Sequence, residues 1–357
     1  MLRFAATLAL IAALVEGVAQ AQEESIPRLH EVYRADFQMG VSLGHSELES
    51  AAHQELLTHF NAITPENDMK WESIQPTEGN FTFEATDALV AYAAKENKRF
   101  TAHTLVWNNQ TPEWVFQDAD GNPASRELVL SRMRTHIQTV MQRYKGRVDG
   151  WDVVNEALSD APREYLREGP WLRTVGEDYA VQAFKIAREV DPEAKLYYND
   201  YALELPNKRE KMVRLVKELQ AAGVAPDAVN LQGHYSLGTP PVAQIEATIQ
   251  TITDLGLRAN ISELDVSFFS FFQQDNPYPD GAPADLLEQQ AQRYGELFAL
   301  FREHEDKLDR ITFWNLHDGV SWLNHHPVPN RSDYPLLFDK DGKPKPAFFT
   351  VVEAGRR

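Results

Sequence analysis

Short apolar runs alternate with longer amphipathic stretches along most of the chain. The runs are rich in Val, Ile, Leu and aromatic residues, which is typical of strands buried on both faces. We predict eight such strands, at residues 37–43, 62–66, 99–106, 148–155, 194–199, 228–233, 258–264 and 310–316. The stretches between them carry apolar residues at spacings of three and four. This periodicity predicts helices, among them residues 85–97, 126–144, 178–190, 207–222, 241–255 and 284–304.

Proline and glycine mark several helix ends. Pro241 stands where a first-turn proline is expected, and Gly223 and Gly256 stand where helices stop. Eight strands alternating with helices predict an α/β fold, a (β/α)8 TIM barrel in a single domain. A doubly wound open sheet gives a similar pattern. The count of eight strands and the lack of a Gly-rich dinucleotide loop in the sequence favour the barrel.

The first residues have the pattern of an export signal. Arg3 gives a positive start, residues 4–15 are apolar, and a small-x-small site ends at Ala21. About a dozen apolar residues is too short to span a bilayer. We therefore predict a signal peptide at residues 1–21, a catalytic domain at residues 24–357, and a secreted or periplasmic protein with no membrane association after cleavage.

Composition narrows the possible partners and chemistry. The 357 residues are 43% hydrophobic and carry a formal charge of -18 without a basic run, so no nucleic-acid partner is expected. The sequence contains no cysteine, which rules out disulfides, thiolate metal sites and a cysteine nucleophile. The sequence has no H-x-H or H-E-x-x-H arrangement, and the side chains of the adjacent His325 and His326 would diverge in an extended segment, so no metal site is expected. No other cofactor is expected. We expect a monomer.

In a barrel, functional residues gather at the C-terminal ends of the strands. The predicted strands end in polar and aromatic residues where aliphatic ones would suffice for a core. These residues are Glu66, Asn67, His103, Trp107, Asn155, Glu156, Asn199, Asp200, Gln232, His234, Glu263 and Trp314. The sequence therefore predicts a site at the barrel mouth.

Two of these residues, Glu156 and Glu263, form a candidate catalytic pair. A partly buried carboxyl has a raised pKa, which suits a general acid, and paired carboxylates are the machinery of glycoside cleavage. A separation of about 5–5.5 Å would make the reaction retaining. The structural alternatives are a capping or surface role for Glu156 and an ion pair with Arg258 for Glu263.

Aromatic residues near the predicted mouth give a second indication. Trp107, Trp314 and Trp322 could serve as flat platforms for sugars, although core packing is the usual role of tryptophan. Four phenylalanines at residues 268–272 could form an extra sugar platform, but we favour packing of a long loop onto the barrel rim.

These residues occur in motifs, and the chain resembles glycoside hydrolase family 10 over nearly all of its mature length. The resemblance is carried by six segments in the family's order, at residues 64–71 (TPENDMKW), 103–107 (HTLVW), 151–157 (WDVVNEA), 232–234 (QGH), 261–265 (ISELD) and 313–322 (FW to SW).

The resemblance implies an endo-β-1,4-xylanase that hydrolyses internal bonds of xylan and xylo-oligosaccharides with retention of configuration. Glu156 matches the acid/base and Glu263 the nucleophile. His234 matches the hydrogen-bond partner of the nucleophile, with Gln232 beside it, and Asn155 matches the amide that holds the sugar 2-hydroxyl. The other residues carried over are the glycone-side groups Asn67 and Lys70 and the pocket walls His103, Trp107, Gln110, Trp314 and Trp322.

Two departures from the family pattern bear on substrate preference. Asn108 replaces a frequent histidine, and Asn315 replaces a frequent glycine. A serine esterase is an alternative, because residues 40–44 match the G-x-S-x-G elbow around Ser42. A non-catalytic polysaccharide-binding protein is another. Of the glycosylation sequons at Asn80, Asn260 and Asn330, we interpret that at Asn260 as accidental, because it lies in a predicted core strand.

Overall fold

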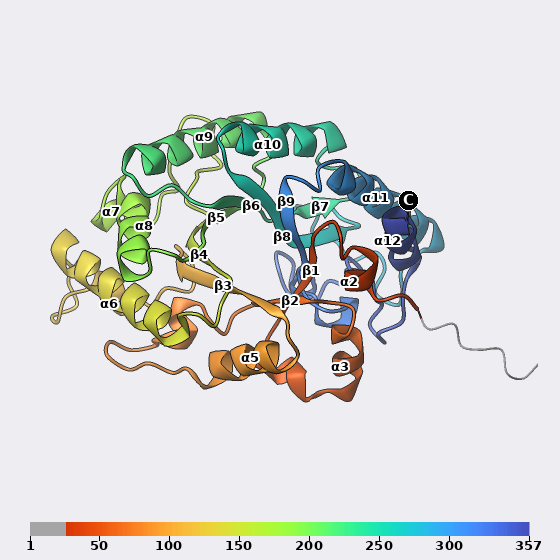
Figure 1. The fold of residues 1–357 in the computed structure, drawn as a ribbon, viewed down its shortest axis with the longest axis horizontal. Coiled ribbons are helices and arrows are strands. Elements are labelled where there is room, and N and C mark those ends of the chain that lie inside the picture. The colour runs from red at the N-terminus through yellow and green to blue at the C-terminus, as the bar shows by residue number, and fades with distance from the viewer. Residues whose placement is uncertain (1–25, 357) are drawn as a thin grey trace, which may run out of the picture.

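The computed structural model describes residues 26–356, and the predicted signal peptide lies outside them. Eight parallel strands form a closed barrel ringed by helices (Figure 1). Pairing of β6 with β8 and of β9 with β1 completes the ring, which confirms the barrel and excludes the open sheet. The strands of the ring are β1 (Gln38–Leu43), β2 (Ala62–Pro65), β3 (Arg99–Val106), β4 (Gly150–Asn155), β5 (Leu196–Asp200), β6 (Ala228–Leu231), β8 (Arg258–Ser267) and β9 (Leu308–Phe313).

Each predicted strand corresponds to one strand of the ring, with ends that agree within three residues. The largest correction is at residues 228–233, where β6 ends early and a short additional strand, β7 (His234–Ser236), pairs with the extended end of β8. Gly233 makes the turn between them with φ 84°, and a Cβ there would lie 2.8 Å from Ile261 Cγ2. Only glycine fits such a close approach in this backbone conformation.

The helices cover the outside of the barrel (Figure 1). All six named predictions are confirmed within two residues. Pro241 is the N-cap of its helix, one position before the predicted first turn. The α-helices of the described residues are α2 (Leu29–Val32), α3 (Ala51–Leu57), α4 (Trp71–Ile74), α5 (Glu84–Lys95), α6 (Arg126–Tyr144), α7 (Pro170–Thr174), α8 (Tyr179–Val190), α9 (Pro206–Ala221), α10 (Val242–Asp254), α11 (Ala284–Glu303) and α12 (Pro346–Arg356). Four 3-10 helices are η1 (His45–Glu49), η2 (Glu113–Phe116), η3 (Asp318–Val320) and η4 (Trp322–Asn324).

Helix α6 illustrates why these segments fold as they do. The Ser125 hydroxyl accepts a hydrogen bond from Leu128 N at 3.2 Å and caps the first turn. Its buried residues follow the three- and four-residue spacing, so one face packs inward. Glycines follow the C-terminal ends of two other helices, as predicted for helix stops. Gly223 adopts φ 75° after α9, and Gly256 adopts φ 80° after α10.

The barrel interior contains polar side chains as well as aliphatic ones. Asn260 donates to Asn230 at 2.8 Å, and Asn230 donates to Asp152 at 2.7 Å. All three residues are no more than 1% exposed, so these hydrogen bonds satisfy polar groups that water does not reach. Burial of Asn260 agrees with the interpretation of its sequon as accidental.

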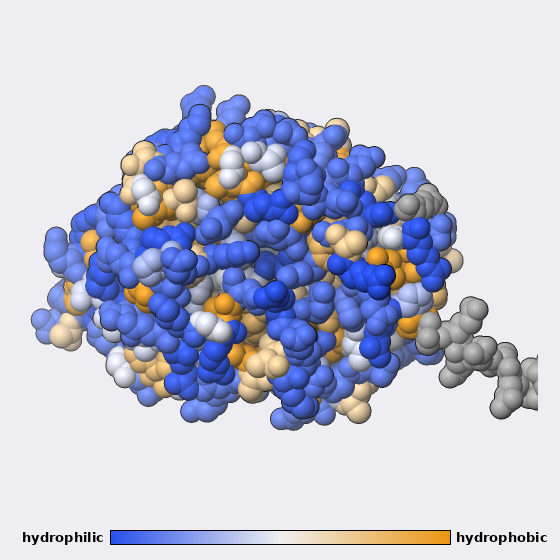
Figure 2. All heavy atoms as spheres, viewed as in Figure 1, coloured by the Kyte–Doolittle hydropathy of each residue, from blue (hydrophilic) through white to orange (hydrophobic). Residues whose placement is uncertain are grey.

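The molecular surface is mostly hydrophilic on the face drawn in Figure 2, with hydrophobic residues in small scattered patches. This surface fits the acidic composition of the chain. Among residues 26–356, no helix is both long and apolar enough to cross a membrane.

Candidate active site

Glu156 follows directly after β4, at the C-terminal mouth of the barrel. Its backbone adopts φ 55°, a left-handed conformation that is uncommon outside glycine and is often found at functional sites. Gln232 Nε2 donates to Glu156 Oε1 at 3.1 Å. Burial raises the pKa of Glu156, and the negative charge of Asp200 raises it further. The carboxyl is therefore suited to stay protonated and to act as a general acid.

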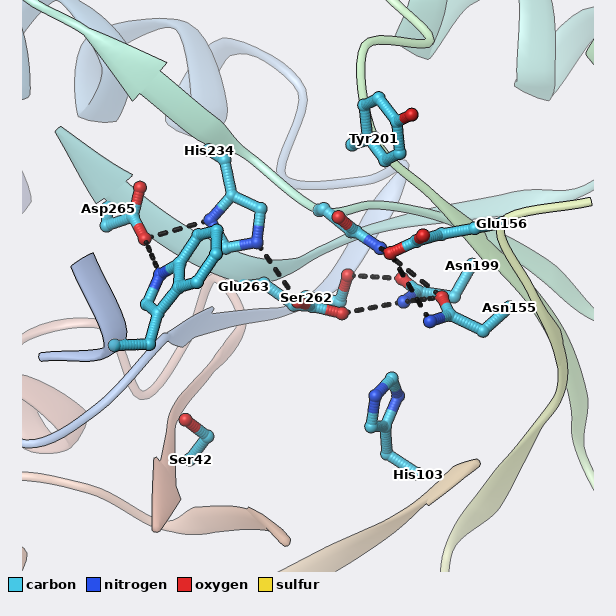
Figure 3. Close-up of polar contacts among 12 residues, drawn as sticks. Ser42, His103, Asn155, Glu156, Asn199, Tyr201, His234, Ser262, Glu263 and Asp265 are labelled. Carbon is cyan, nitrogen blue, oxygen red and sulfur yellow. Dashed lines mark hydrogen bonds and ion pairs between the residues drawn. The ribbon is translucent and has the colours of Figure 1, made fainter. Parts of the chain in front are cut away.

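Glu263 lies in β8 and is 5% exposed. Asn199 Nδ2 donates to its Oε1 at 2.7 Å, and His234 Nε2 lies 3.1 Å from its Oε2 (Figure 3). Burial alone would raise the pKa of Glu263, but the pKa is lowered. The hydrogen bond from His234, the charges of His103 and His234, and the hydrogen bond from Asn199 together outweigh the effect of burial. Arg258 pairs with Asp309 at 2.6 Å, so the predicted alternative of an Arg258–Glu263 ion pair is wrong.

His234 lies between two carboxylates, as Figure 3 shows. Its Nδ1 is 2.8 Å from Asp265 Oδ2, on the side of the ring away from Glu263. Burial lowers the pKa of His234, but the charges and hydrogen bonds of Asp265 and Glu263 raise it to about 10. His234 is therefore an imidazolium that keeps Glu263 ionised and fixes its orientation.

Asp265 also positions Trp322, whose Nε1 donates to the same Oδ2 atom at 2.8 Å. The Trp322 ring lies 4.8 Å from the His234 ring, between centroids. The Asp265 carboxylate therefore positions both His234, which contacts Glu263, and the Trp322 ring beside it.

A second group of predicted residues is linked to the loop after β2. Lys70 Nζ donates to Asn67 Oδ1 at 2.9 Å, and Gln110 Nε2 donates to the same oxygen at 3.3 Å. The Lys70 ammonium lies 4.8 Å from the centroid of the Trp107 ring, a cation–π contact. Trp107 is held in turn by a hydrogen bond of 2.8 Å from Trp171 Nε1 to its carbonyl.

The two groups are linked electrostatically, because the Lys70 charge acts on both Glu263 and Glu156. The remaining predicted residues lie beside the two glutamates. Asn155 Oδ1 accepts hydrogen bonds from Asn199 Nδ2 at 2.8 Å and from Gln232 Nε2 at 3.3 Å. His103 Nδ1 lies 2.8 Å from Asp152 Oδ2. The Trp314 ring packs edge-on against His103 at 5.4 Å, and Trp314 is only 5% exposed.

The structure thus brings all twelve predicted site residues into one network at the barrel mouth. Sequence analysis did not assign roles to three residues that support it, Asn199, Asp265 and Asp152. Asn199 did appear among the strand ends, which was a usable signal, and Asp265 lies within the motif around Glu263.

The alternative chemistries receive no geometric support. Ser42 is fully buried, and its hydroxyl accepts a hydrogen bond from Asn315 N at 2.8 Å, so it is not presented as a nucleophile. Within residues 26–356, no group of three His, Asp or Glu side chains could hold a metal ion.

The two departures from the family pattern have local explanations. Asn315 adopts φ 82°, a conformation that favours glycine and that asparagine tolerates better than most residues. Its Oδ1 accepts a hydrogen bond from Trp322 N at 2.9 Å, which a glycine could not do. Asn108 lies against Gly169, where an added Cβ would be only 2.2 Å from Asn108 Oδ1.

Two buried glutamates at a barrel mouth, one with a raised pKa and one with a lowered pKa, form the kind of carboxyl pair that glycoside hydrolases use. Residues 28–354 match the family described as glycosyl hydrolase family 10, and the chain belongs to this family. It is 45% identical to an endo-1,4-beta-xylanase from Geobacillus stearothermophilus, over 92% of this chain and 98% of that protein. It is 41% identical to a beta-1,4-xylanase from Dictyoglomus thermophilum, over 98% and 99% of the two chains.

Solved structures agree with this assignment. A crystal structure of a xylanase from Paenibacillus barcinonensis, complexed with a conduramine derivative, superposes with a TM-score of 0.89 at 39% identity, covering 92% of this chain and 99% of that one. A structure of an endo-1,4-beta-xylanase from Caldicellulosiruptor owensensis gives 0.87 at 42% identity, covering 92% and 99%.

Proposed function

We propose that the protein is an endo-β-1,4-xylanase that cleaves internal bonds of xylan with retention of configuration. The observation that carries this proposal is the opposite shift of the two carboxyl pKa values, upward at Glu156 and downward at Glu263. The xylanase names of relatives that match nearly the full length of the chain support the choice of substrate.

The two carboxyl groups have different roles in the reaction. Glu263 is ionised and attacks the anomeric carbon, forming a covalent glycosyl-enzyme, while protonated Glu156 gives its proton to the leaving oxygen. Glu156 then takes a proton from water, and that water releases the sugar from Glu263. Asn155 holds the 2-hydroxyl of the sugar at the cleavage point, and Asn67 and Lys70 hold the sugars on the glycone side.

The side chains that line the site determine which sugar is accepted. Xylose lacks the hydroxymethyl arm of glucose, so a bulky side chain such as Trp322 rejects glucose by steric clash and admits xylose. Digestion of xylan, mixed-linkage glucan, mannan and cellulose by the purified protein tests this choice. Short xylo-oligosaccharides should appear early, and faster cleavage of glucan or mannan would contradict the preference for xylan.

The roles of the glutamates are tested by a matched pair of variants. Glu156→Ala should lose xylan hydrolysis but keep the first step on an aryl glycoside with a good leaving group, and azide should restore turnover as a β-glycosyl azide. Glu263→Ala should lose activity on both substrates, because no leaving group replaces the nucleophile. A 2-fluoro-xyloside label on a residue other than Glu263, or initial α product by proton NMR, would refute the mechanism.

Export is a separate part of the proposal. The protein is secreted or periplasmic, and its leader is removed after Ala21 to leave the domain that begins near residue 24. Mass spectrometry of the exported product measures the new N-terminus. Active exported protein that retains Met1 would contradict the signal peptide.

A further inference from the structure

The phenylalanine cluster at residues 268–272 divides into two pairs with different environments. Phe269 is 3% exposed and lies beneath the Arg331 guanidinium, 4.6 Å from its ring centroid, and Phe268 packs against Tyr334. Phe271 and Phe272 are 49% and 84% exposed. The packing interpretation is therefore confirmed for the first pair and wrong for the second.

The exposed pair continues a row of rings that begins at the catalytic centre. Trp322 stacks on His326 with 5.5 Å between ring centroids and 18° between planes. His326 lies 5.8 Å from Phe271, and Phe271 lies 5.6 Å from Phe272. We call these four residues, Trp322, His326, Phe271 and Phe272, the aromatic ledge. Its inner end contacts His234, the partner of the nucleophile.

The loop that carries the outer half of the ledge is tied to the loop that carries the inner half. Arg331 Nη1 donates to the Gln273 carbonyl at 2.7 Å, Ser332 N donates to Asn276 Oδ1 at 3.2 Å, and Tyr334 OH donates to the Tyr278 carbonyl at 2.6 Å. The loop that follows the exposed rings is thus held in place before any ligand binds. Preorganisation of this kind lowers the entropy lost on binding.

Exposure of these rings calls for a binding role. Large exposed hydrophobic side chains in the described residues are few, namely Ile26, Leu205, Phe271, Phe272 and Phe349. Single exposed hydrophobic residues are ordinary, but adjacent ones that extend a functional cleft mark a binding surface. The same loop carries Asp275 and Asp280, which disfavour an anionic ligand.

We propose that the aromatic ledge is an additional binding site for a neutral sugar ring of the xylan substrate, beyond the sugars in contact with Glu156 and Glu263. This inference rests on the proposed xylanase function. The occupant is a sugar because the ledge begins at Trp322, whose ring contacts His234 in the candidate active site, and because the C–H faces of sugars pack on aromatic rings. The ring is a unit of the xylan backbone.

The test compares long and short substrates in a double variant, Phe271→Ala/Phe272→Ala. Both side chains are exposed, so the fold should be retained, and thermal unfolding checks this. We expect kcat/KM on xylohexaose and linear xylan to fall about five- to tenfold, through KM, as for loss of an interface aromatic. An aryl xylobioside should be cleaved as in the parent protein. A Phe271→Tyr/Phe272→Tyr variant should restore the parent values, because it restores the rings.

Phe349→Ala is the matched control, since Phe349 is 52% exposed but lies on α12. It should leave both substrates unaffected. If the parent is active on xylan and the ratio of kcat/KM on long substrates to kcat/KM on the aryl xylobioside is unchanged in the Phe271→Ala/Phe272→Ala variant, the proposed sugar site is refuted. The xylanase proposal is then unaffected. Parent protein inactive on every xylan substrate would instead refute the proposed function. A larger fall on arabinoxylan than on linear xylan would identify the bound ring as a branch sugar and contradict its assignment as a backbone unit.

Discussion

The isosteric substitution Asp265→Asn should lower the pKa of His234 while leaving the imidazole ring in place. The amide oxygen of asparagine can still accept hydrogen bonds from His234 and Trp322, so the substitution mainly removes a negative charge. The pKa of His234 is raised from 6.5 to about 10, which corresponds to about 5 kcal/mol in favour of the charged ring. Two carboxylates share this effect, and loss of one should remove about 2–3 kcal/mol.

The consequence should be visible on the alkaline side of the pH profile. A loss of about 2–3 kcal/mol lowers the pKa of His234 by about two units, since each unit is about 1.4 kcal/mol, so the ring stays charged through the acid range but loses its proton earlier as the pH rises. We expect the acid limb of the kcat/KM profile to stay in place and the alkaline limb to move to lower pH by about two units. Activity should fall most above neutrality, where a neutral His234 no longer supplies a charged hydrogen-bond partner to Glu263.

The assay is the pH dependence of kcat/KM on an aryl xylobioside, whose good leaving group makes the first step independent of Glu156. Trp322→Phe is the control, because it removes the hydrogen bond to Asp265 and keeps every charge. Its alkaline limb should coincide with that of the parent. An Asp265→Asn profile whose alkaline limb does not move, or moves to higher pH, would refute the assignment of His234 as a charged partner of Glu263 that depends on Asp265 for its proton.

Three further substitutions test supporting contacts. Asn199→Ala removes a donor to Glu263 and should lower kcat/KM by about 10- to 100-fold at low pH, since a hydrogen bond to a charged group contributes about 1.5–3 kcal/mol. Steady-state kinetics measures this change, and an unchanged kcat/KM would contradict the role of Asn199 in stabilising ionised Glu263. Asn315→Ala should lower the free energy of unfolding by about 1–3 kcal/mol because alanine is strained at positive φ, and Asn315→Gly should lower it less. Urea denaturation measures both variants, and a glycine variant less stable than the alanine variant would be inconsistent with backbone strain at this position. Ser42→Ala should keep most of the activity in the same kinetic assay, and complete loss would revive the serine-hydrolase alternative.

Much of the fold could be predicted because the barrel strands are buried on both faces and therefore appear as apolar runs. Strand β7 could not, because its pairing with β8 depends on the turn at Gly233 and on the close approach of Ile261. The exposed half of the phenylalanine cluster was also predicted wrongly. Nothing in the two phenylalanine pairs on either side of Ser270 distinguishes the packed rings from those that face solvent.

The sequence was sufficient to predict which residues form the candidate site, but not which of them are ionised. Strand-end positions and the family resemblance identified Glu156 and Glu263. The ionisation of each depends on neighbours from other strands, such as Asp200 beside Glu156 and His234 beside Glu263. Those neighbours are distant in sequence, so their effect on pKa required the three-dimensional arrangement.

Closure of the barrel between β1 and β9 has a consequence for synthesis of the chain. The hydrogen bond between Asn315 and Ser42 joins residues that are 273 positions apart. Until the last strand leaves the ribosome, β1 and β8 each keep an unpaired edge, and such edges promote aggregation. A nascent chain or fragment that stops before β9 should therefore depend on chaperones, and completion of the C-terminal segment should be the step that commits the protein to its native state.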